Sequence, residues 1–281
     1  AGELLYLTDD AIAASFDVKE VFGEALVPIL ADQAFAKELS LEGAVRFSDY
    51  NTIGSTTTWK LGAQWAPSSD VRFRATRSRS VRAPNLSELY NPGSTSNQFI
   101  LDPCDASRIN LNPNRAANCA ALGLPVGYVD PTTGVFKTIV TSGNPDLGPE
   151  KSNSWTAGAV FTPGAIHGLS ASVDWWKIDI QGAVGTVPVE RAVDNCVDAS
   201  TIDNPFCTLV TRSSDGAISS VNVSPINVGS LSAEGVDFHA NYQRPIGAVE
   251  GRLAIAGTYL IENKLEVVEG DPTTLDIARG E

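Results

Sequence analysis

The stretch GNPDLGPEKSNSWTAG, residues 143–158, marks the point where a long polar segment returns to regular structure. Pro145 and Pro149 fix their own φ angles, lack an amide donor, and bias the residue before each toward extended backbone. Because a proline cannot pair inside a central strand, we expect strand pairing to begin directly after Pro149. The rest of the chain must then show what kind of sheet this segment enters.

Alternation of apolar and polar residues is the dominant pattern, and helical periodicity is scarce. The segments LEGAVRFSDY (41–50), LSASVDWW (169–176) and EGVDFHANYQ (234–243) show it clearly. A short helical turn is expected near 186–195. The alternation predicts an all-β chain with eight strands, which we place at residues 15–30, 38–50, 56–66, 71–82, 150–161, 169–182, 231–244 and 251–264.

The connections between these strands alternate in length. The first, third, fifth and seventh are short, whereas the two longest, 83–149 and 183–230, fall among the even-numbered ones. In an antiparallel meander, odd and even connections lie at opposite ends. Outer-membrane barrels have short periplasmic turns and long extracellular loops. The pattern therefore favours an antiparallel, up-and-down transmembrane β-barrel, and a soluble β-sandwich with one wetted face is the alternative.

The two faces of such a sheet would differ in environment. In a membrane barrel the apolar face meets lipid and the polar face lines the lumen. We expect lipid contact for Val71, Phe73, Leu169, Val173, Val236 and Phe238. We expect the lumen face to carry Arg72, Arg74, Ser170, Trp176, Asp237 and His239.

Composition excludes several classes of protein. The formal net charge of −13 argues against nucleic acid as a partner, which would require a basic surface. The sequence contains no run of 18 apolar residues and no signal peptide, so a helical membrane protein is not expected. The first residue lies within a pattern and is not Met, which predicts that the chain begins inside a longer protein.

The four cysteines form two local pairs, Cys104 with Cys119 and Cys196 with Cys207, each within a polar, proline-containing segment. Neither spacing is typical of a zinc site, and no histidine lies near. We expect two loop disulfides in an oxidising compartment. Four unpaired thiols are the alternative.

Two segments in this order carry a family resemblance. VRAPNLSELY (81–90) followed by GNPDLGPEKSNSWTAG resembles the TonB-dependent outer-membrane receptors, in which the first segment ends an upward strand and the second leads into the next downward strand. The motif residues are Arg82, Ala83, Pro84, Asn144, Pro145, Asp146, Leu147, Pro149 and Glu150. We interpret this motif as structural, because it sets where strand pairing resumes after the long loop.

The sequence also departs from the family pattern. The family has an N-terminal plug domain inside a barrel of about 22 strands. No plug is recognisable here, and the chain ends DIARGE rather than in a terminal aromatic residue. We therefore expect residues 1–281 to form part of one barrel domain, truncated at both ends, whose first and last strands do not pair with each other.

Arginines crowd the strand predicted at 71–82: Arg72, Arg74, Arg77, Arg79 and Arg82. Strict alternation would split them between the two faces, unless a bulge or the strand end places them together. They could contact a plug or an anionic solute. Pairing with lumen carboxylates on neighbouring strands, for instance Glu42 or Asp174, is the interpretation we favour.

Two further lumen candidates have modest roles. Trp176 could stack on a sugar ring, although a packing or girdle role is preferred. His239 is expected to be hydrogen-bonded rather than a metal ligand. No catalytic motif is present, so we expect no enzyme, no metal and no cofactor.

The resemblance implies a receptor in the outer membrane of a Gram-negative bacterium. Such a receptor binds a scarce solute (a siderophore, cobalamin or a carbohydrate) and imports it with energy coupled from the inner membrane. Its partners would be membrane lipid, its own plug and remaining strands, the TonB energy complex and the solute. The alternatives are a passive porin-type barrel and a soluble β-rich glycan-binding or adhesion module.

Overall fold

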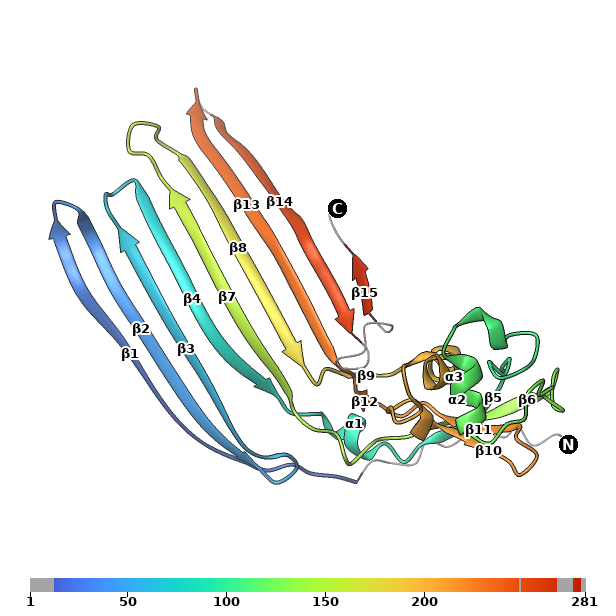
Figure 1. The fold of residues 1–281 in the computed structure, drawn as a ribbon. Coiled ribbons are helices and arrows are strands. Elements are labelled where there is room, and N and C mark those ends of the chain that lie inside the picture. Colours follow the sequence, from blue (N-terminus) through green and yellow to red (C-terminus); the bar gives the residue numbers. More distant parts are fainter. Residues whose placement is uncertain (1–12, 248, 267–274, 279–281) are drawn as a thin grey trace, which may run out of the picture.

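The computed structural model describes residues 13–247, 249–266 and 275–278. Its main feature is a nine-stranded sheet in which all neighbouring strands are antiparallel and follow sequence order (Figure 1). The strands are β1 Val18–Gln33, β2 Ala36–Tyr50, β3 Gly54–Ala66, β4 Val71–Arg82, β7 Glu150–Phe161, β8 Leu169–Gln181, β13 Ser230–Ile246, β14 Val249–Glu266 and β15 Leu275–Ala278.

The predicted strands are all present. β4 and β7 match the predicted bounds at both ends, and β7 begins directly after Pro149, as its chemistry required. The other predicted strands differ from the observed ones by a few residues. The short strand β15, paired with the end of β14, was not predicted.

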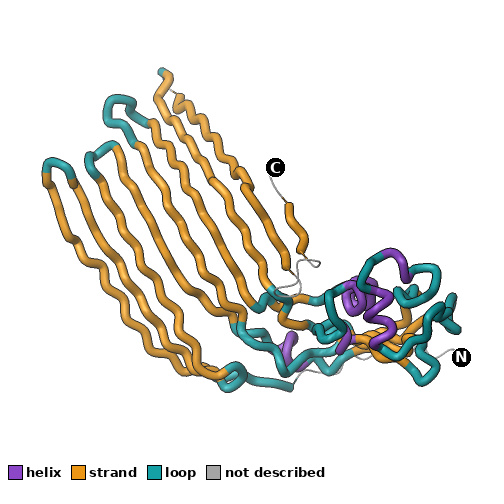
Figure 2. The backbone as a smooth tube through the Cα atoms, in the orientation of Figure 1, coloured by secondary structure: helices purple, strands orange, loops and turns teal. Residues whose placement is uncertain are grey.

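Both long connections lie at the same end of the sheet, which also carries the short turn 51–53 between β2 and β3. The short turns 34–35, 67–70 and 162–168 lie at one end, together with the turn between β13 and β14 (Figure 1). Segments 83–149 and 182–229 leave the sheet at the other end and form what we call the loop module (Figures 1 and 2). The up-and-down meander is therefore confirmed.

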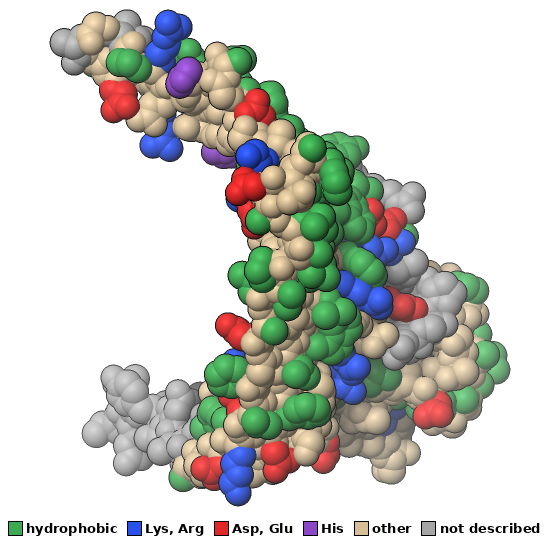
Figure 3. Space-filling view, turned by 90° about the vertical axis from the view of Figure 1, so that its left-hand side faces the viewer, with side chains coloured by type: hydrophobic (Ala, Val, Ile, Leu, Met, Phe, Trp, Pro, Cys, Tyr) green, Lys and Arg blue, Asp and Glu red, His purple; other side chains and the backbone are tan. Residues whose placement is uncertain are grey.

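Register gives the sheet two chemically distinct faces. Phe73 pairs with Ala159, which pairs with Val173, which pairs with Phe238, so these side chains lie in one row on one face, here called the apolar face. The next residue along each strand points to the other face, here called the polar face. Figure 3 shows hydrophobic side chains gathered over the middle of the sheet, with charged side chains toward its ends.

The apolar face is exposed to an unusual degree. Side chains as large as Phe73 (42% exposed), Val173 (54%) and Phe238 (45%) have no protein cover. A soluble sandwich would bury such a face against a second layer. An uncovered apolar sheet face matches the lipid-contacting wall of a membrane barrel.

The described strands do not close on themselves, because β1 and β15 lie at opposite edges of the sheet (Figure 1). The prediction that the first and last strands do not pair is confirmed for the described residues. The fold is thus an open portion of an antiparallel barrel wall.

The loop module has its own secondary structure, where the sequence indicated only loops and one short helix. It holds a four-stranded sheet in the order β10-β11-β6-β5 and a two-stranded pair, β12-β9. The strands are β5 Ser94–Phe99, β6 Phe136–Thr141, β9 Val184–Gly185, β10 Val210–Arg212, β11 Ile218–Asn222 and β12 Ile226–Asn227. The helices are α1 Leu86–Tyr90, α2 Arg115–Ala121 and α3 Val189–Asp198, with 3-10 turns η1 Ile109–Leu111 and η2 Cys207–Leu209.

The hydrophobic core of the described residues lies entirely in the loop module, where Val193, Val197, Phe206, Ile218 and Val221 are almost fully buried. The amphipathic helix α3 supplies two of them. None of the helices described here has the length and apolar character needed to cross a membrane.

Candidate functional site

The loop module is where side chains from distant segments meet. Strand β11, from the second long loop, pairs in parallel with β6, from the first, with Ser220 opposite Thr138 and Asn222 opposite Val140. Each loop therefore supplies part of one sheet. The two loops therefore fold as a single unit and are not structurally independent.

Both predicted disulfides are present, Cys104–Cys119 and Cys196–Cys207. They close sequence separations of 15 and 11 residues. Each lies in or against the hydrophobic core cluster of the module. The local pairing inferred from the sequence is confirmed.

A buried arginine joins α2 to α3. Arg115, whose side chain is 4% exposed, donates from Nε and Nη2 to the two carboxylate oxygens of Asp198 (2.5 and 2.9 Å) and from Nη2 to Asp194 (3.0 Å). These hydrogen bonds raise the pKa of Arg115, whereas burial raises that of Asp194. From the same helix, Asn118 Nδ2 donates to the carbonyls of Val197 and Ala199 and satisfies the end of α3.

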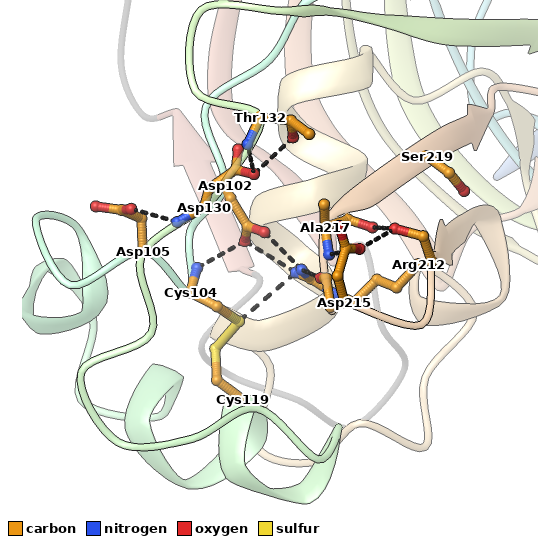
Figure 4. Close-up of polar contacts among 12 residues, drawn as sticks. Asp102, Cys104, Asp105, Cys119, Asp130, Thr132, Arg212, Asp215, Ala217 and Ser219 are labelled. Atoms are coloured by element: carbon orange, nitrogen blue, oxygen red, sulfur yellow. Dashed lines mark hydrogen bonds and ion pairs between the residues drawn. A yellow bond between two sulfur atoms is a disulfide. The ribbon is translucent and has the colours of Figure 1, made fainter.

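A second arginine ties the end of β10 to the first loop (Figure 4). Arg212 donates to both oxygens of Asp102 (2.5 and 2.9 Å) and to the carbonyl of Gly216 (2.8 Å). The Asp102 carboxylate is fully buried and also accepts from the backbone amide of Cys104. Removing either partner would leave the other charge buried and uncompensated, so both residues are needed for a stable contact between the two loops.

A third set of polar contacts, around Asp130, holds the segment that follows Cys119 (Figure 4). Asp130 accepts from the amide and hydroxyl of Thr132, and its own amide donates to Asp105 (2.9 Å). Lys137, 3% exposed, lies 3.5 Å from the Asp130 carboxylate. Hydrogen bonds from Ser107 and the Asp130 amide lower the pKa of Asp105.

Most basic side chains of the loop module are paired with carboxylates. Arg108, Arg115, Lys137 and Arg212 each pair with a carboxylate inside the module, whereas Arg191 is exposed. In the described part of the chain, no group of three or more His, Cys, Asp or Glu residues could hold a metal ion. Four basic side chains of the module are therefore engaged with carboxylates, and Arg191 is the exception.

The first half of the family motif anchors the base of the module. Arg82, the last residue of β4, donates two hydrogen bonds to Glu150, the first residue of β7 (2.6 and 2.7 Å). Its remaining nitrogen donates to Glu88 (3.0 and 3.2 Å). Glu150 also accepts from the amide of Val184 in the second loop (2.7 Å). Ala83 follows Arg82 and leads to Pro84, which is buried and precedes Asn85, the N-cap of α1.

The second half of the motif ties the same base to the second loop. Asn144 Nδ2 donates to the carbonyl of Pro225 (3.0 Å), and the Gly148 amide donates to Asn227 Oδ1 (2.8 Å). The Asn144 side chain accepts from the Asp146 amide across Pro145, and Leu147 is buried beneath. The motif acts as a brace between both loops, a larger role than the restart of pairing inferred from sequence.

Three residues of this brace were not found from the sequence. Glu88 could have been, because Asn85 and Glu88 have the spacing of a capping box, and both reciprocal hydrogen bonds are present. Asn227 and Val184 carry no local signal, because their partners lie 79 and 34 residues away in sequence.

The lumen candidates on β4 are paired with carboxylates, as favoured from sequence. Arg72 lies 3.5 Å from Glu38, and Arg74 forms a bidentate pair with Asp174 on β8 (2.8 Å for both bonds). Gly158 lies between Arg74 and Asp174 in the register, and a Cβ there would overlap the Asp174 carboxylate. The absence of a side chain at Gly158 lets this pair form across an intervening strand.

The other candidates lie on the same polar face. The ring of Trp176 lies over Gly235, where an added Cβ would come within 2.6 Å of it, so a packing role is supported. Asp237 accepts from the hydroxyl of Thr258 (2.7 Å). His239 is exposed, and that its side chain is hydrogen-bonded stays a prediction. That this polar face lines a lumen stays a prediction.

One expectation about charged residues is wrong, and one open alternative is resolved. Glu42 pairs with Lys60 rather than with an arginine. Arg77 and Arg79 are not brought to the polar face by a bulge, because the register of β4 with β3 and β7 is continuous. They lie on the apolar face, near the loop-module end.

The comparison with known protein families shows the family of this chain. The family model described as TonB dependent receptor-like, beta-barrel matches residues 6–275. The chain belongs to the TonB-dependent receptor family.

Solved structures of family members are similar in fold. The ferric enterobactin receptor PfeA of Pseudomonas aeruginosa is 15% identical, with a TM-score of 0.52 over 90% of this chain and 30% of that chain. The siderophore receptor PirA of the same organism is 13% identical, with a TM-score of 0.48 over 89% of this chain and 37% of that chain. The chain thus spans about a third of the receptors it resembles.

Proposed function

We propose that this chain supplies part of the barrel wall and the extracellular surface of an outer-membrane active-transport receptor. The receptor would bind a scarce solute and import it with energy coupled from the inner membrane. Residues 1–281 would belong to one barrel domain, with the loop module on the outside of a Gram-negative cell.

The observation that carries the proposal is the asymmetry of the sheet. One end has short turns, and the other holds a folded module with its own core and two disulfides. Disulfides persist in oxidising compartments, and long structured loops of outer-membrane barrels face outward. A passive porin needs no such structured module, so the module and the family membership together favour active transport.

The solute is proposed only by class. PfeA is described as a ferric enterobactin receptor and PirA as a siderophore receptor, but the low identity supports the fold alone. A siderophore, cobalamin and a carbohydrate remain the proposed range. The proposed partners are membrane lipid, a plug domain with further barrel strands, and the TonB energy complex. We propose no catalytic role, because the sequence carries no catalytic motif.

Orientation can be tested with introduced thiols on the full-length receptor, because the four cysteines of residues 1–281 are in disulfides and the parent protein serves as the labelling control. Ser214→Cys lies in an exposed turn of the module, and Ser68→Cys lies in the exposed turn between β3 and β4. A membrane-impermeant maleimide added to intact cells should label Ser214→Cys. It should label Ser68→Cys only after lysis. The reverse pattern would overturn the orientation.

Transport is tested separately. Cells with and without the inner-membrane energy complex are compared for uptake of ferric siderophores, cobalamin and oligosaccharides through the full-length receptor. Uptake that depends on the complex supports the proposal. Uptake that is equal in both strains would make the protein a passive channel.

A further inference from the structure

Arg77 and Arg79 lie on the same face of the sheet as Phe73, near the loop-module end, where that face also carries Lys177, Asp179 and Glu234 farther along the same rows. Arg77 pairs in register with Leu61 on one side and Trp155 on the other, and Arg79 pairs with Trp59 and Asn153. The row of Arg77 continues through Leu61 to Gly43, and that of Arg79 through Trp59 to Val45. Two positive charges therefore border a surface that the barrel turns to lipid.

These two arginines differ from the others on β4 in their partners. Arg72, Arg74 and Arg82 each pair with a carboxylate. Within residues 13–247, 249–266 and 275–278, Arg77 and Arg79 have no carboxylate partner. The Arg77 guanidinium lies over the rings of Trp155 (4.5 Å) and Trp59 (5.7 Å), which fix its position.

Arg79 has a hydrogen-bond donor that lacks an acceptor among the described residues. Its Nε is buried and has no hydrogen-bond partner among the described residues. A buried donor left without a partner is unfavourable, and a guanidinium matches the oxygens of a phosphate in geometry and charge. Because the Nε atom is itself covered, an anionic group bound between the two arginines would meet the rest of the guanidinium groups and neutralise their charge.

An apolar groove begins in the next row of residues. A depression of about 570 Å³ has a floor of Ala63, Ala75, Ala157 and Ala159 and walls that include Trp65, Phe73, Trp175 and Val236. Trp65 and Phe73 stack with ring centroids 5.5 Å apart, which makes one wall rigid. Small side chains between large aromatic ones leave an apolar depression that an acyl chain could occupy.

We propose that this part of the wall binds a phosphate-bearing membrane lipid, with its phosphate between Arg77 and Arg79 and an acyl chain over the alanine floor. Charge complementarity selects a phosphate, and the adjoining groove selects a lipid over free phosphate. The arginines lie toward the loop module, so the lipid belongs to the outer leaflet. This assignment of leaflet rests on the proposed orientation, whereas the binding site itself does not depend on which solute is transported.

The test uses the full-length receptor in a non-ionic detergent, titrated with lipid A and followed by native mass spectrometry. The double variant Arg77→Gln, Arg79→Gln should bind lipid A at least tenfold more weakly. Arg72→Gln is the matched control, because it removes one arginine from the polar face of the same strand; its binding should be unchanged. Ala157→Leu fills the exposed groove floor without adding polarity and should weaken binding severalfold.

Two competitors identify the chemistry. Diacylglycerol, which lacks phosphate, should bind the wild-type receptor much more weakly than lipid A. Inorganic phosphate should not displace lipid A at equal concentration. Lipid A that binds the double variant as tightly as the wild type would overturn the proposal. So would equal weakening by Arg72→Gln, equal binding of diacylglycerol, or displacement by inorganic phosphate. If the double variant does not fold, unchanged binding by Ala157→Leu overturns it.

Orientation is separable from this result. Failure of the thiol-labelling test would move the lipid to the other leaflet and leave lipid A binding in detergent intact. Failure of the lipid titration would leave the transport proposal untouched.

Discussion

Replacing Arg82 with Gln should loosen the base of the loop module while leaving the barrel wall folded. Arg82 makes two short hydrogen bonds to Glu150 and two longer ones to Glu88. Glutamine is uncharged and cannot reproduce this fork. The change therefore removes the charged centre that joins the start of the first loop to its end.

The magnitude follows from the exposure of the three side chains. Exposed ion pairs contribute about 0.2–1 kcal/mol, and breaking a buried pair costs about 3–5 kcal/mol. The Arg82 side chain is 43% exposed, and those of Glu88 and Glu150 are 22% and 17% exposed. We expect a cost of about 2 kcal/mol, between these limits, which corresponds to roughly a 30-fold change in a local opening equilibrium.

Hydrogen exchange on the full-length receptor measures this opening amide by amide. The informative amides are those of Asn144, Gly148 and Val184, which donate to Glu88, Asn227 and Glu150 across the base. In Arg82→Gln they should exchange roughly 30-fold faster. Arg82→Lys keeps the charge but loses the fork, so its effect should be intermediate.

Arg74→Gln is the matched control, because Arg74 also makes a bidentate pair on β4 but joins it to Asp174 in the middle of the wall. It should leave the amides at the base of the module unchanged. Equal exchange in Arg82→Gln and wild type would refute the brace. So would equal acceleration by Arg74→Gln, because the effect would then be general to the strand.

Three further predictions concern the wall and the module. Gly158→Ala should destabilise the wall by about 1–3 kcal/mol, because its Cβ overlaps the Asp174 carboxylate; an unchanged unfolding midpoint in detergent would contradict this. Replacing Cys196 and Cys207 by Ser should destabilise the module by about 3 kcal/mol, seen as protease cleavage within it, and intact loops under the same digestion would count against it. Burial, followed by nearby carboxylates, raises the pKa of Tyr128 to about 12. The folded protein thus keeps a proton that the unfolded chain loses near pH ~10, and stability should fall as pH rises from there to about 12. The phenolate absorbance lost in Tyr128→Phe should titrate in this upper range; titration near pH ~10 would refute it.

The strands could be predicted because their signals are local. Alternation fixed the eight long strands, and the prolines before Glu150 placed the start of β7 to the residue. The loop module could not be predicted, because its sheet depends on β11 pairing with a strand about 80 residues earlier in the chain. Proline-rich, polar composition looks the same in a loose loop and in a unit that buries Phe206 and Val221 through long-range contacts.

The site residues divide in the same way. The disulfides were readable from local cysteine spacing, and Arg74 with Asp174 from strand parity. Parity also placed Arg77 and Arg79 on the apolar face, and the alternative that a bulge moves them is not borne out. When only one strand is considered, a charged residue at an apolar-face position suggests that the register of that strand has been misassigned. The continuous register with β3 and β7 shows that it is a feature of the surface.

The brace at the base of the loop module has a consequence for gating. It ties together the ends of β4, β7, β8 and β13 through Arg82, Glu150, Asn144 and Asn227, and the Asn227 side chain donates to the carbonyls of both Gly148 and Gly182. Above it, the core and disulfides hold the two loops as one body. A solute that displaces the module must therefore shift these four strand ends, because neither loop can move alone. The two kinds of variant should therefore have different effects. Loss of a disulfide should destabilise the folded loops without weakening the brace, whereas loss of Arg82 should weaken the brace without destabilising the folded loops. If solute binding were communicated by independent loops, the two kinds of variant would instead affect the same amides.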